Sequence, residues 1–214
     1  GKVYEIDNII GKTTIFNKSS KSILVSGNAN YASIIDIEKW RDVEKLLSKV
    51  WINHHYLNEK ENKLGMSLDD GTVLIGSIND WKKSNNKIKT HDQYSLGIIN
   101  MENNLWACGG VSPETILIFD DRKTEVPLKS INSNYFCSSK FVYSTKFKLL
   151  FSVELWGSVQ IIDVENLDLE PQTISFASNT GGIDIDETNN LFYLSLEHPI
   201  TKDYSSLIEF EIVK

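Results

Sequence analysis

Residues 149–163 read LLFSVELWGSVQIID, in which two apolar runs flank a short turn around Gly157. Apolar runs of about four to eight residues bounded by turn residues are typical of buried β-strands. Two such runs separated by a tight turn indicate a hairpin of antiparallel strands. We therefore predict that this stretch forms two neighbouring strands inside a β-sheet.

This pattern occurs five times along the chain. When the five copies are aligned at the end of their second strand, the successive steps are 41, 43, 43 and 48 residues. A period of about 40 to 45 residues that carries several short strands is typical of β-propeller blades. One small sheet cannot bury both of its faces, whereas radially stacked sheets cover one another. The aligned strand ends are Asp36, Ser77, Asp120, Asp163 and Glu211.

Each repeat also has room for an earlier strand, as the four-stranded blades of propellers require. The predicted fold class is therefore all-β: a β-propeller of about five four-stranded blades, or part of a larger propeller completed by another chain or by further sequence. The 214 residues are expected to form a single domain. Repeats are expected near residues 12–48, 49–89, 90–131, 132–176 and 177–214.

Two further segments bear on how the repeats are completed. Residues 2–7 read KVYEID and alternate like a strand, so we expect them to close the ring as the outermost strand of the final blade. Residues 40–49 have helical spacing, because Leu46 and Leu47 lie three and four residues after Val43. The same segment fits an outer strand followed by a loop equally well, and both alternatives stay open.

The composition is that of an ordinary globular protein, with 41% hydrophobic and 24% charged residues. The net charge of −7 and the pI of about 5.2 argue against a general nucleic-acid binder, which needs a basic surface to displace counterions from phosphate. The densest cationic cluster, around Lys82 and Lys83, is interrupted by polar residues and is interpreted as a solvated loop. No apolar run approaches the roughly 18 residues of a membrane helix, so no membrane span is expected.

The chain contains two cysteines, Cys108 and Cys137, each within an apolar stretch. Two cysteines do not make the dense disulfide framework of a small secreted domain, and buried thiols in a reducing compartment fit the sequence better. An intracellular protein, cytoplasmic or nuclear, is therefore expected. The first residue is Gly1 rather than Met, which suggests a trimmed or partial chain.

The sequence carries no motif for catalysis or metal binding. Asp184 and Asp186 would share one face of a strand, where they fit either a cation site or, as we favour, a solvated turn. No Gly-x-Ser-x-Gly elbow occurs, and Gly109-Gly110 lacks the lysine and hydroxyl residue of a P-loop. We therefore expect no cofactor, no metal and no identifiable catalytic residue, and an enzyme is the less favoured alternative. The histidines, interpreted as polar loop residues without zinc-site spacing, are His54, His55, His91 and His198.

Three of the second strands end in an apolar residue followed by aspartate, at Ile35-Asp36, Phe119-Asp120 and Ile162-Asp163. In the WD40-repeat family this place is taken by a Trp-Asp pair. His91, three residues before Tyr94, is similar to the histidine that the family has upstream of the first strand. The chain thus resembles a divergent WD40-repeat propeller: the period covers most of its length, whereas Trp-Asp and Gly-His pairs are absent.

If the repeats are blades, the loops between second and third strands and those entering each first strand lie on one face of the disc. Exposed aromatic side chains there are the best hot-spot candidates, because Trp and Tyr offer large contact areas with few rotatable bonds. Trp156 at the hairpin tip is the first choice, with packing over a neighbouring blade as the alternative. Trp51 and Trp106 are instead expected in the core. The expected partner-binding residues are Trp156, Tyr31, His91, Tyr94, Tyr135 and Tyr204.

The resemblance and the missing catalytic motifs together favour a non-catalytic scaffold for protein–protein interaction. We expect a subunit of an intracellular eukaryotic complex, whose partners are other protein subunits. One alternative is a propeller enzyme or small-ligand binder that uses the central channel. Another is a nucleic-acid or phosphoinositide reader, which needs a basic patch assembled from Lys82, Lys83, Lys87, Lys89 and Arg122.

Overall fold

A computed structural model of the chain describes residues 11–17, 21–27, 30–39, 41–102, 104–123, 125–133, 140–154, 157–176, 178–197 and 205–213. Within these ranges the chain forms nineteen β-strands, the four-residue helix α1 (Trp81–Ser84) and a 3-10 turn at Ile78–Asp80. No helix in the same ranges is long and apolar enough to cross a membrane. Residues 2–7, predicted to close the ring, lie outside the described residues.

Consecutive strands pair with one another and form five antiparallel sheets, which we call blades 1 to 5. Blade 1 contains β1 (Gly11–Asn17), β2 (Ser22–Gly27), β3 (Tyr31–Asp36) and β4 (Arg41–Leu47). Blade 2 contains β5 (Ile52–Asn58), β6 (Lys63–Leu68), β7 (Thr72–Ser77) and β8 (Asn86–Lys89). Blade 3 contains β9 (Ser95–Asn100), β10 (Leu105–Gly110), β11 (Thr115–Asp120) and β12 (Lys129–Asn132).

Blades 4 and 5 complete the described residues. Blade 4 contains β13 (Lys140–Ser144), β14 (Leu149–Glu154), β15 (Ser158–Asp163) and β16 (Gln172–Ser175). Blade 5 contains β17 (Asn179–Asp186), β18 (Leu191–Glu197) and β19 (Ser205–Glu211). The stretch at 149–163 forms β14 and β15, which pair antiparallel from Leu149 opposite Asp163 to Glu154 opposite Ser158.

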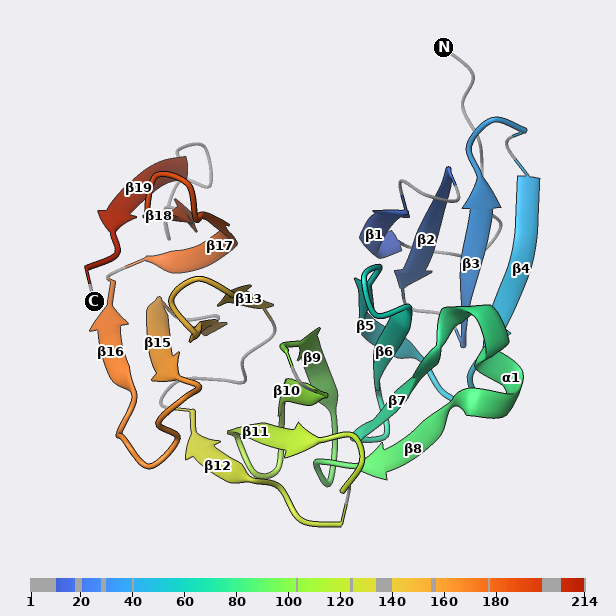
Figure 1. Cartoon of the computed structure of the whole chain (residues 1–214), viewed down its shortest axis with the longest axis horizontal. Coiled ribbons are helices and arrows are strands. Elements are labelled where there is room, and N and C mark those ends of the chain that lie inside the picture. The colour runs from blue at the N-terminus through green and yellow to red at the C-terminus, as the bar shows by residue number, and fades with distance from the viewer. Residues whose placement is uncertain are drawn as a thin grey trace.

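The blades stand side by side along an arc, as Figure 1 shows. In each blade the first strand lies nearest the middle of the arc and the last strand lies furthest out (Figure 1). Blades 1 and 5 flank an opening, so the described residues form an open arc rather than a ring. The prediction of an all-β propeller of about five four-stranded blades, or part of a larger one, is confirmed. Blade 5 has three strands within the described residues.

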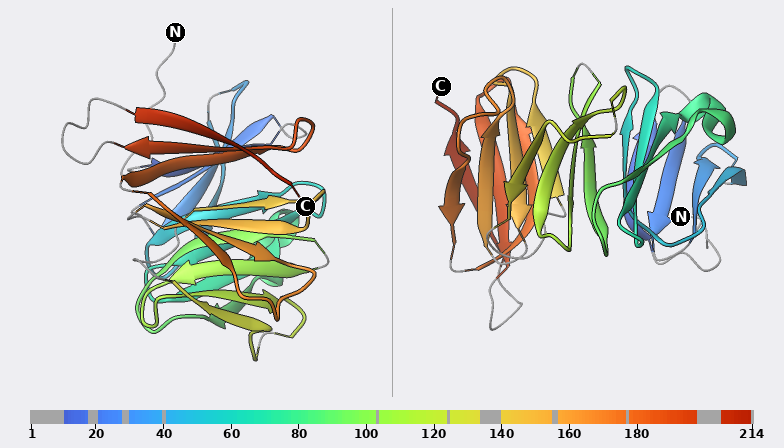
Figure 2. Two further views of the ribbon diagram at one scale, coloured as in Figure 1. Left: turned by 90° about the vertical axis from the view of Figure 1, so that its left-hand side faces the viewer. Right: turned by 90° about the horizontal axis from the view of Figure 1, so that it is seen from below.

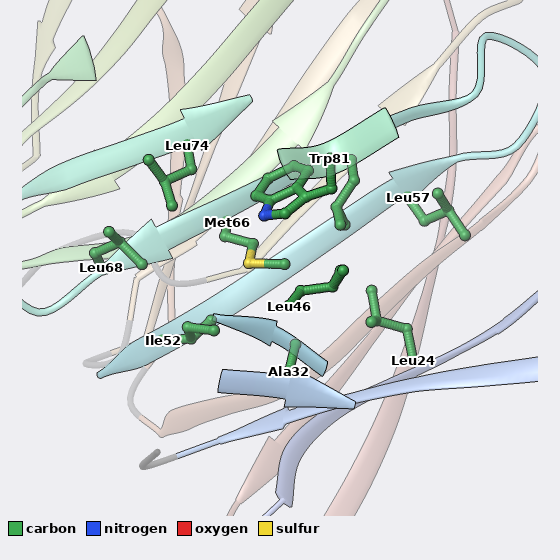
Figure 3. Packing of buried hydrophobic residues seen from close by; sticks show 10 residues of the cluster. Leu24, Ala32, Leu46, Ile52, Leu57, Met66, Leu68, Leu74 and Trp81 are labelled. Carbon is green, nitrogen blue, oxygen red and sulfur yellow. The ribbon is translucent and has the colours of Figure 1, made fainter. Parts of the chain in front are cut away.

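The hydrophobic core is divided into layers that lie between neighbouring blades. Between blades 1 and 2, Leu24 and Leu46 lie opposite Ile52 and Met66 (Figure 3). Successive side chains of a strand point to opposite faces, so a strand with a blade on either side is apolar on both faces. This is why the second and third strands read as nearly continuous apolar runs. Burial of one such Leu, Ile or Met side chain contributes about 1.5–3 kcal/mol.

Residues 41–47 form the outer strand β4, which settles the choice between helix and strand. Leu46 is buried between blades 1 and 2, whereas its neighbour Leu47 is exposed, which is the alternation of a strand. The lysine pair Lys82-Lys83, expected in a loop, lies in the short helix α1. The buried side chain of Trp81, at the start of α1, packs into the layer between blades 1 and 2 and holds the helix against the blades (Figure 3).

Trp106 and Cys108 occupy the interior of blade 3, in β10. Trp106 is fully buried, and its Nε1 donates a hydrogen bond to Oδ2 of Asp121 at 3.0 Å, so the prediction of a core tryptophan is confirmed there. Cys108 is a free, buried thiol, and burial raises its pKa to about 12. Cys137 lies outside the described residues.

Candidate functional site

One rim of the arc is formed by the loops between the second and third strands and by those joining one blade to the next; we call it the loop face. Because successive strands are antiparallel, both kinds of loop fall at the same end of the blades. The right-hand view of Figure 2 shows the strands running from one rim to the other. Backbone hydrogen bonds tie the loops together: Ser48 donates to Asn30 at 2.7 Å, and Val111 donates to Tyr94 at 2.8 Å. These hydrogen bonds therefore hold neighbouring loops of this face together.

Trp51 is the largest exposed side chain among the described residues of the loop face, at 52% exposure. It stands one residue before β5, so Ile52 enters the core while the indole stays outside. Its carbonyl oxygen accepts a hydrogen bond from the Asp69 amide at 3.0 Å. The prediction that Trp51 is a core residue is therefore wrong, because the strand begins after it. An open depression of about 510 Å³ lies beside it and is lined by Asn30, Lys49, Val50, Trp51 and Asp69.

Tyr94 and Tyr31 are the two predicted tyrosines within the described residues. Tyr94 precedes β9 and is 43% exposed, as a partner contact requires. Tyr31 opens β3 and is half-buried, with Nζ of Lys45 lying 4.8 Å from the centre of its ring. The lysine covers part of one face of the ring, so Tyr31 offers less surface to a partner than Tyr94.

His91, which was predicted as a partner contact, is instead buried, with only 1% of its surface exposed. Its Nε2 lies 3.1 Å from the carbonyl oxygen of Thr115, and its backbone amide donates to Gly71 at 2.9 Å. Burial lowers the pKa of the ring. A buried, neutral histidine that joins the loop before β9 to β11 supports the loop face from beneath and offers no surface to a partner.

Trp156, Tyr135 and Tyr204, the other predicted contacts, lie outside the described residues. The turn next to Trp156 is described from Gly157 onward, where φ is +90°. The neighbouring carboxylate Glu154 is fully buried and accepts a hydrogen bond from Ser133 at 2.7 Å. This hydrogen bond links β14 to the residue that follows β12, so the base of the hairpin is anchored to blade 3.

β5, the innermost strand of blade 2, carries His54 and His55, which were expected in a loop. His55 is fully buried, and its Nδ1 shares a hydrogen bond with Oγ of Ser26 in blade 1. Burial lowers the pKa of His55 to about 3 and that of His54 to about 4. Both rings are therefore neutral at pH 7, and the loop interpretation of these two histidines is wrong because β5 starts at Ile52.

Two of the basic residues that a nucleic-acid reader would use, Lys87 and Arg122, form ion pairs with aspartates. Nζ of Lys87 lies 3.0 Å from Oδ2 of Asp70, and Nζ of Lys89 donates to the carbonyl oxygen of the same aspartate at 2.7 Å. Arg122 contacts Asp120 through two nitrogens, at 2.9 and 2.6 Å. Hydrogen bonds from Arg122 lower the pKa of that carboxyl to about 2. These two ion pairs reduce the positive charge that Lys87 and Arg122 offer to phosphate.

Asp184 and Asp186 lie on β17, where the sequence left a cation site as one alternative. Oδ1 of Asp186 accepts the amides of Thr188 at 2.9 Å and Asn189 at 3.1 Å, so this carboxylate stabilises the turn after β17. Hydrogen bonds from Asn189 lower its pKa. Among the residues that the structure describes, no group of three or more His, Cys, Asp or Glu side chains is placed to hold a metal ion.

No protein-family model matches the chain, and no curated protein matches it. In contrast, 1417 chains of solved structures match its fold, so the architecture recurs widely and does not select a function by itself. One is a chain of the crystal structure of the mitotic checkpoint complex, with 10% sequence identity and a TM-score of 0.78. The match covers 98% of this chain and 67% of that chain. The fold is thus that of a WD40-like propeller.

Proposed function

We propose that the chain is a non-catalytic scaffold that binds other protein subunits through its loop face. The observation that carries the proposal is the exposure of Trp51 beside an open depression, together with Tyr94 on the same rim. Trp and Tyr are the side chains most enriched at binding hot spots, because they bury large areas at low entropic cost. The polar residues around Trp51, such as Lys49 and Asp69, suit the hydrated rim that surrounds such a hot spot.

The hydrogen bonds within the loop face support the same proposal. Loops that are already ordered lose little conformational freedom on binding, so more of the contact energy is available as affinity. Trp51 and Tyr94 both sit on loops whose backbones are bonded to a neighbouring loop. We propose the remaining predicted aromatic residues, Trp156, Tyr135, Tyr204 and Tyr31, as further contacts on this rim.

We further propose that the chain is a divergent WD40-repeat protein and a subunit of an intracellular eukaryotic complex, cytoplasmic or nuclear. The repeat period of the sequence and the WD40-like fold support the family assignment. The similar solved structure is itself that of a complex, which supports a role in assembly. The net charge of −7 and the ion pairs of Lys87 and Arg122 favour protein over nucleic acid as the partner.

The proposal is tested by capturing partners from the protein's own source with the tagged full chain and with the double variant Trp51→Ala, Tyr94→Ala. We expect the unmodified chain to retain at least one protein in stoichiometric amount at moderate salt. Loss of a central aromatic contact costs about 2 kcal/mol, which is roughly a thirtyfold increase in Kd. The Kd of each captured protein for the two chains, measured by calorimetry, gives this ratio directly.

Leu128→Ala is the matched control for the aromatic variants. Leu128 is 53% exposed, similar to Trp51, but it lies in the loop between β11 and β12 at the opposite rim. Its removal is expected to leave the captured proteins unchanged. Equal capture by the double variant and the unmodified chain, with both folded by circular dichroism, would rule out the loop face as the binding surface.

A further inference from the structure

Within the described residues, blade 5 ends at its third strand, whereas the other blades have a fourth strand outside the third. β19 holds the third position, the place of β3, β7, β11 and β15, each of which pairs with a fourth strand. Among the described residues, β19 pairs with β18 on one side, and no strand of these ranges pairs with its other side. Its outer edge therefore presents backbone donors and acceptors that another strand can pair with. Leu207, two residues before Glu209, is 71% exposed on the face of blade 5 that points away from blade 4, whereas Val159, at the matching distance from the end of β15, is covered by blade 5.

The neighbouring fourth strand, β16, shows what blade 5 leaves uncovered. Ile88 in β8, Ile131 in β12 and Ile174 in β16 hold equivalent positions, opposite Val73, Ile116 and Val159 of the adjoining strands. Ile88 and Ile131 are buried in the layers that face the next blade. Ile174 is only half-buried and lines an open groove instead. The apolar face of blade 4 thus extends beyond the three strands of blade 5.

The groove between blades 4 and 5 has a volume of about 440 Å³ and an aromatic wall. The rings of Phe151 and Phe192 stack with centres 4.6 Å apart, and Phe210 lies 6.0 Å from Phe192. Phe176 lies 6.0 Å from Phe210 and continues the wall towards β16. This row of rings beside Ile174 offers continuous apolar surface to side chains that enter the groove along β19.

The rim of the groove is acidic. Asp163 ends β15, Glu170 lies in the loop before β16, and Glu211 ends β19; all three line the groove. In a strand paired with β19, every second side chain points away from the groove, so lysine or arginine at these positions would lie beside Glu209 and Glu211. A second copy's β19 is disfavoured, because it brings its own Glu209 and Glu211 against the same carboxylates. The chain's own residues 2–7, KVYEID, carry two acidic residues and one lysine and match it poorly.

We propose that the outer edge of β19 and this groove bind an extended segment of a partner protein, which pairs with β19 as the fourth strand of blade 5. The segment alternates apolar side chains, which enter the groove beside Ile174 and Phe210, with lysine or arginine side chains, which point to the opposite face of blade 5 beside Glu209 and Glu211. In such strand addition the main chain supplies hydrogen bonds and the alternate side chains supply specificity. This surface lies on the outer circumference of the arc, away from the loop face, and does not depend on the function proposed for that face.

The probe is a fluorescein-labelled peptide of four Lys-Val repeats, titrated with the full chain at about 0.1 M salt and followed by anisotropy. We expect saturable binding, and at least tenfold weaker binding of four Glu-Val repeats and of four Lys-Ser repeats. Ile174→Glu places a charge in the apolar groove and is expected to raise the Kd for the Lys-Val peptide at least tenfold. Ser175→Glu is the matched control, because it adds the same charge on the opposite face of β16 and should change the Kd less than twofold.

Three outcomes would overturn the proposal. Equal affinities for the Lys-Val and Lys-Ser peptides would show that charge alone attracts the probe. Equal effects of Ile174→Glu and Ser175→Glu, in variants with unchanged thermal unfolding, would place the peptide elsewhere. Binding that emerges only when residues 2–7 are deleted would assign the groove to the chain's own segment. The double variant Trp51→Ala, Tyr94→Ala is measured with the same peptide and should bind it as the unmodified chain does. Its result shows whether peptide binding at the groove is independent of the loop face.

Discussion

At the scale of single residues, the boundary of a strand decides whether an aromatic side chain is buried or offered to a partner. Trp51 and Trp106 both adjoin apolar residues in the sequence. Trp106 lies within β10, which has a blade on either side, whereas Trp51 precedes β5 by one residue. Periodicity predicts that a strand exists but not the residue at which it starts. The pair Ser48-Lys49 shortly before Trp51 was the available signal, because polar residues there indicate a loop.

Gly157 shows a backbone requirement of the same local kind. Its φ is +90°, and a Cβ at this position would lie 2.2 Å from the carbonyl oxygen of Ser178. We expect Gly157→Ala to destabilise the chain by about 2 kcal/mol or more, which lowers Tm by roughly 4–8 °C. Gly182→Ala is the matched control, since a Cβ there meets only Oγ of Ser195 at 3.5 Å. Similar thermal unfolding curves for the two variants would contradict this account.

At the scale of strands, the second and third strands of each blade could be predicted, whereas the fourth strands β8, β12 and β16 could not. β10 and β14 are covered by neighbours on both faces and read as apolar runs. β8, β12 and β16 have four residues each, and no more than one residue in any of them is buried. One apolar residue in four carries no periodicity. For the same reason the sequence could not predict that β19 is left with an open edge, because this depends on how many strands blade 5 contains.

The inner strand β5 leads to a prediction about pH. His55 has a pKa of about 3 in the folded chain because it is buried, against 6.5 for an ordinary histidine. Between about pH 3 and pH 6.5 the unfolded chain therefore binds more protons than the folded chain. As a result, the free energy of unfolding falls as the pH falls below about 6.5. Between pH 7 and pH 5 this histidine alone accounts for about 2 kcal/mol of lost stability.

Urea unfolding at pH 7 and pH 5, for the unmodified chain and for His55→Gln, measures this contribution. We expect the loss between the two pH values to be about 2 kcal/mol smaller in the variant. Asn53→Gln changes a neighbouring polar side chain of β5 without removing a titratable group and serves as the control. A variant with the same pH dependence as the unmodified chain would show that His55 stays accessible to protons in the folded state.

At the scale of the whole molecule, polar residues of blade 5 gather on the face that points away from blade 4. On β17, Ile183 and Ile185 point into the layer against blade 4, while the alternate residues Asp184 and Asp186 point to the other face. Glu209 of β19 lies on that same far face, since Asp184 pairs with Tyr193 and Tyr193 with Glu209. The exposed Leu207, two residues before Glu209, lies on this face as well, so the face is mostly but not wholly polar. The alternation of Ile and Asp in residues 183–186 was the sequence signal for the two different faces of β17.

Because each described blade packs mainly on its neighbours along the arc, stability should vary from the middle to the ends. We expect amide hydrogen exchange to be slowest in β10 of blade 3, which is covered on both faces, and at least tenfold faster in β19. The exchange of backbone amides in each blade, measured by mass spectrometry of peptic fragments, tests this order. Equal protection of blades 3 and 5 would mean that both faces of blade 5 are covered in solution. The blades would then unfold as one closed unit, as they would if residues 2–7 completed the ring.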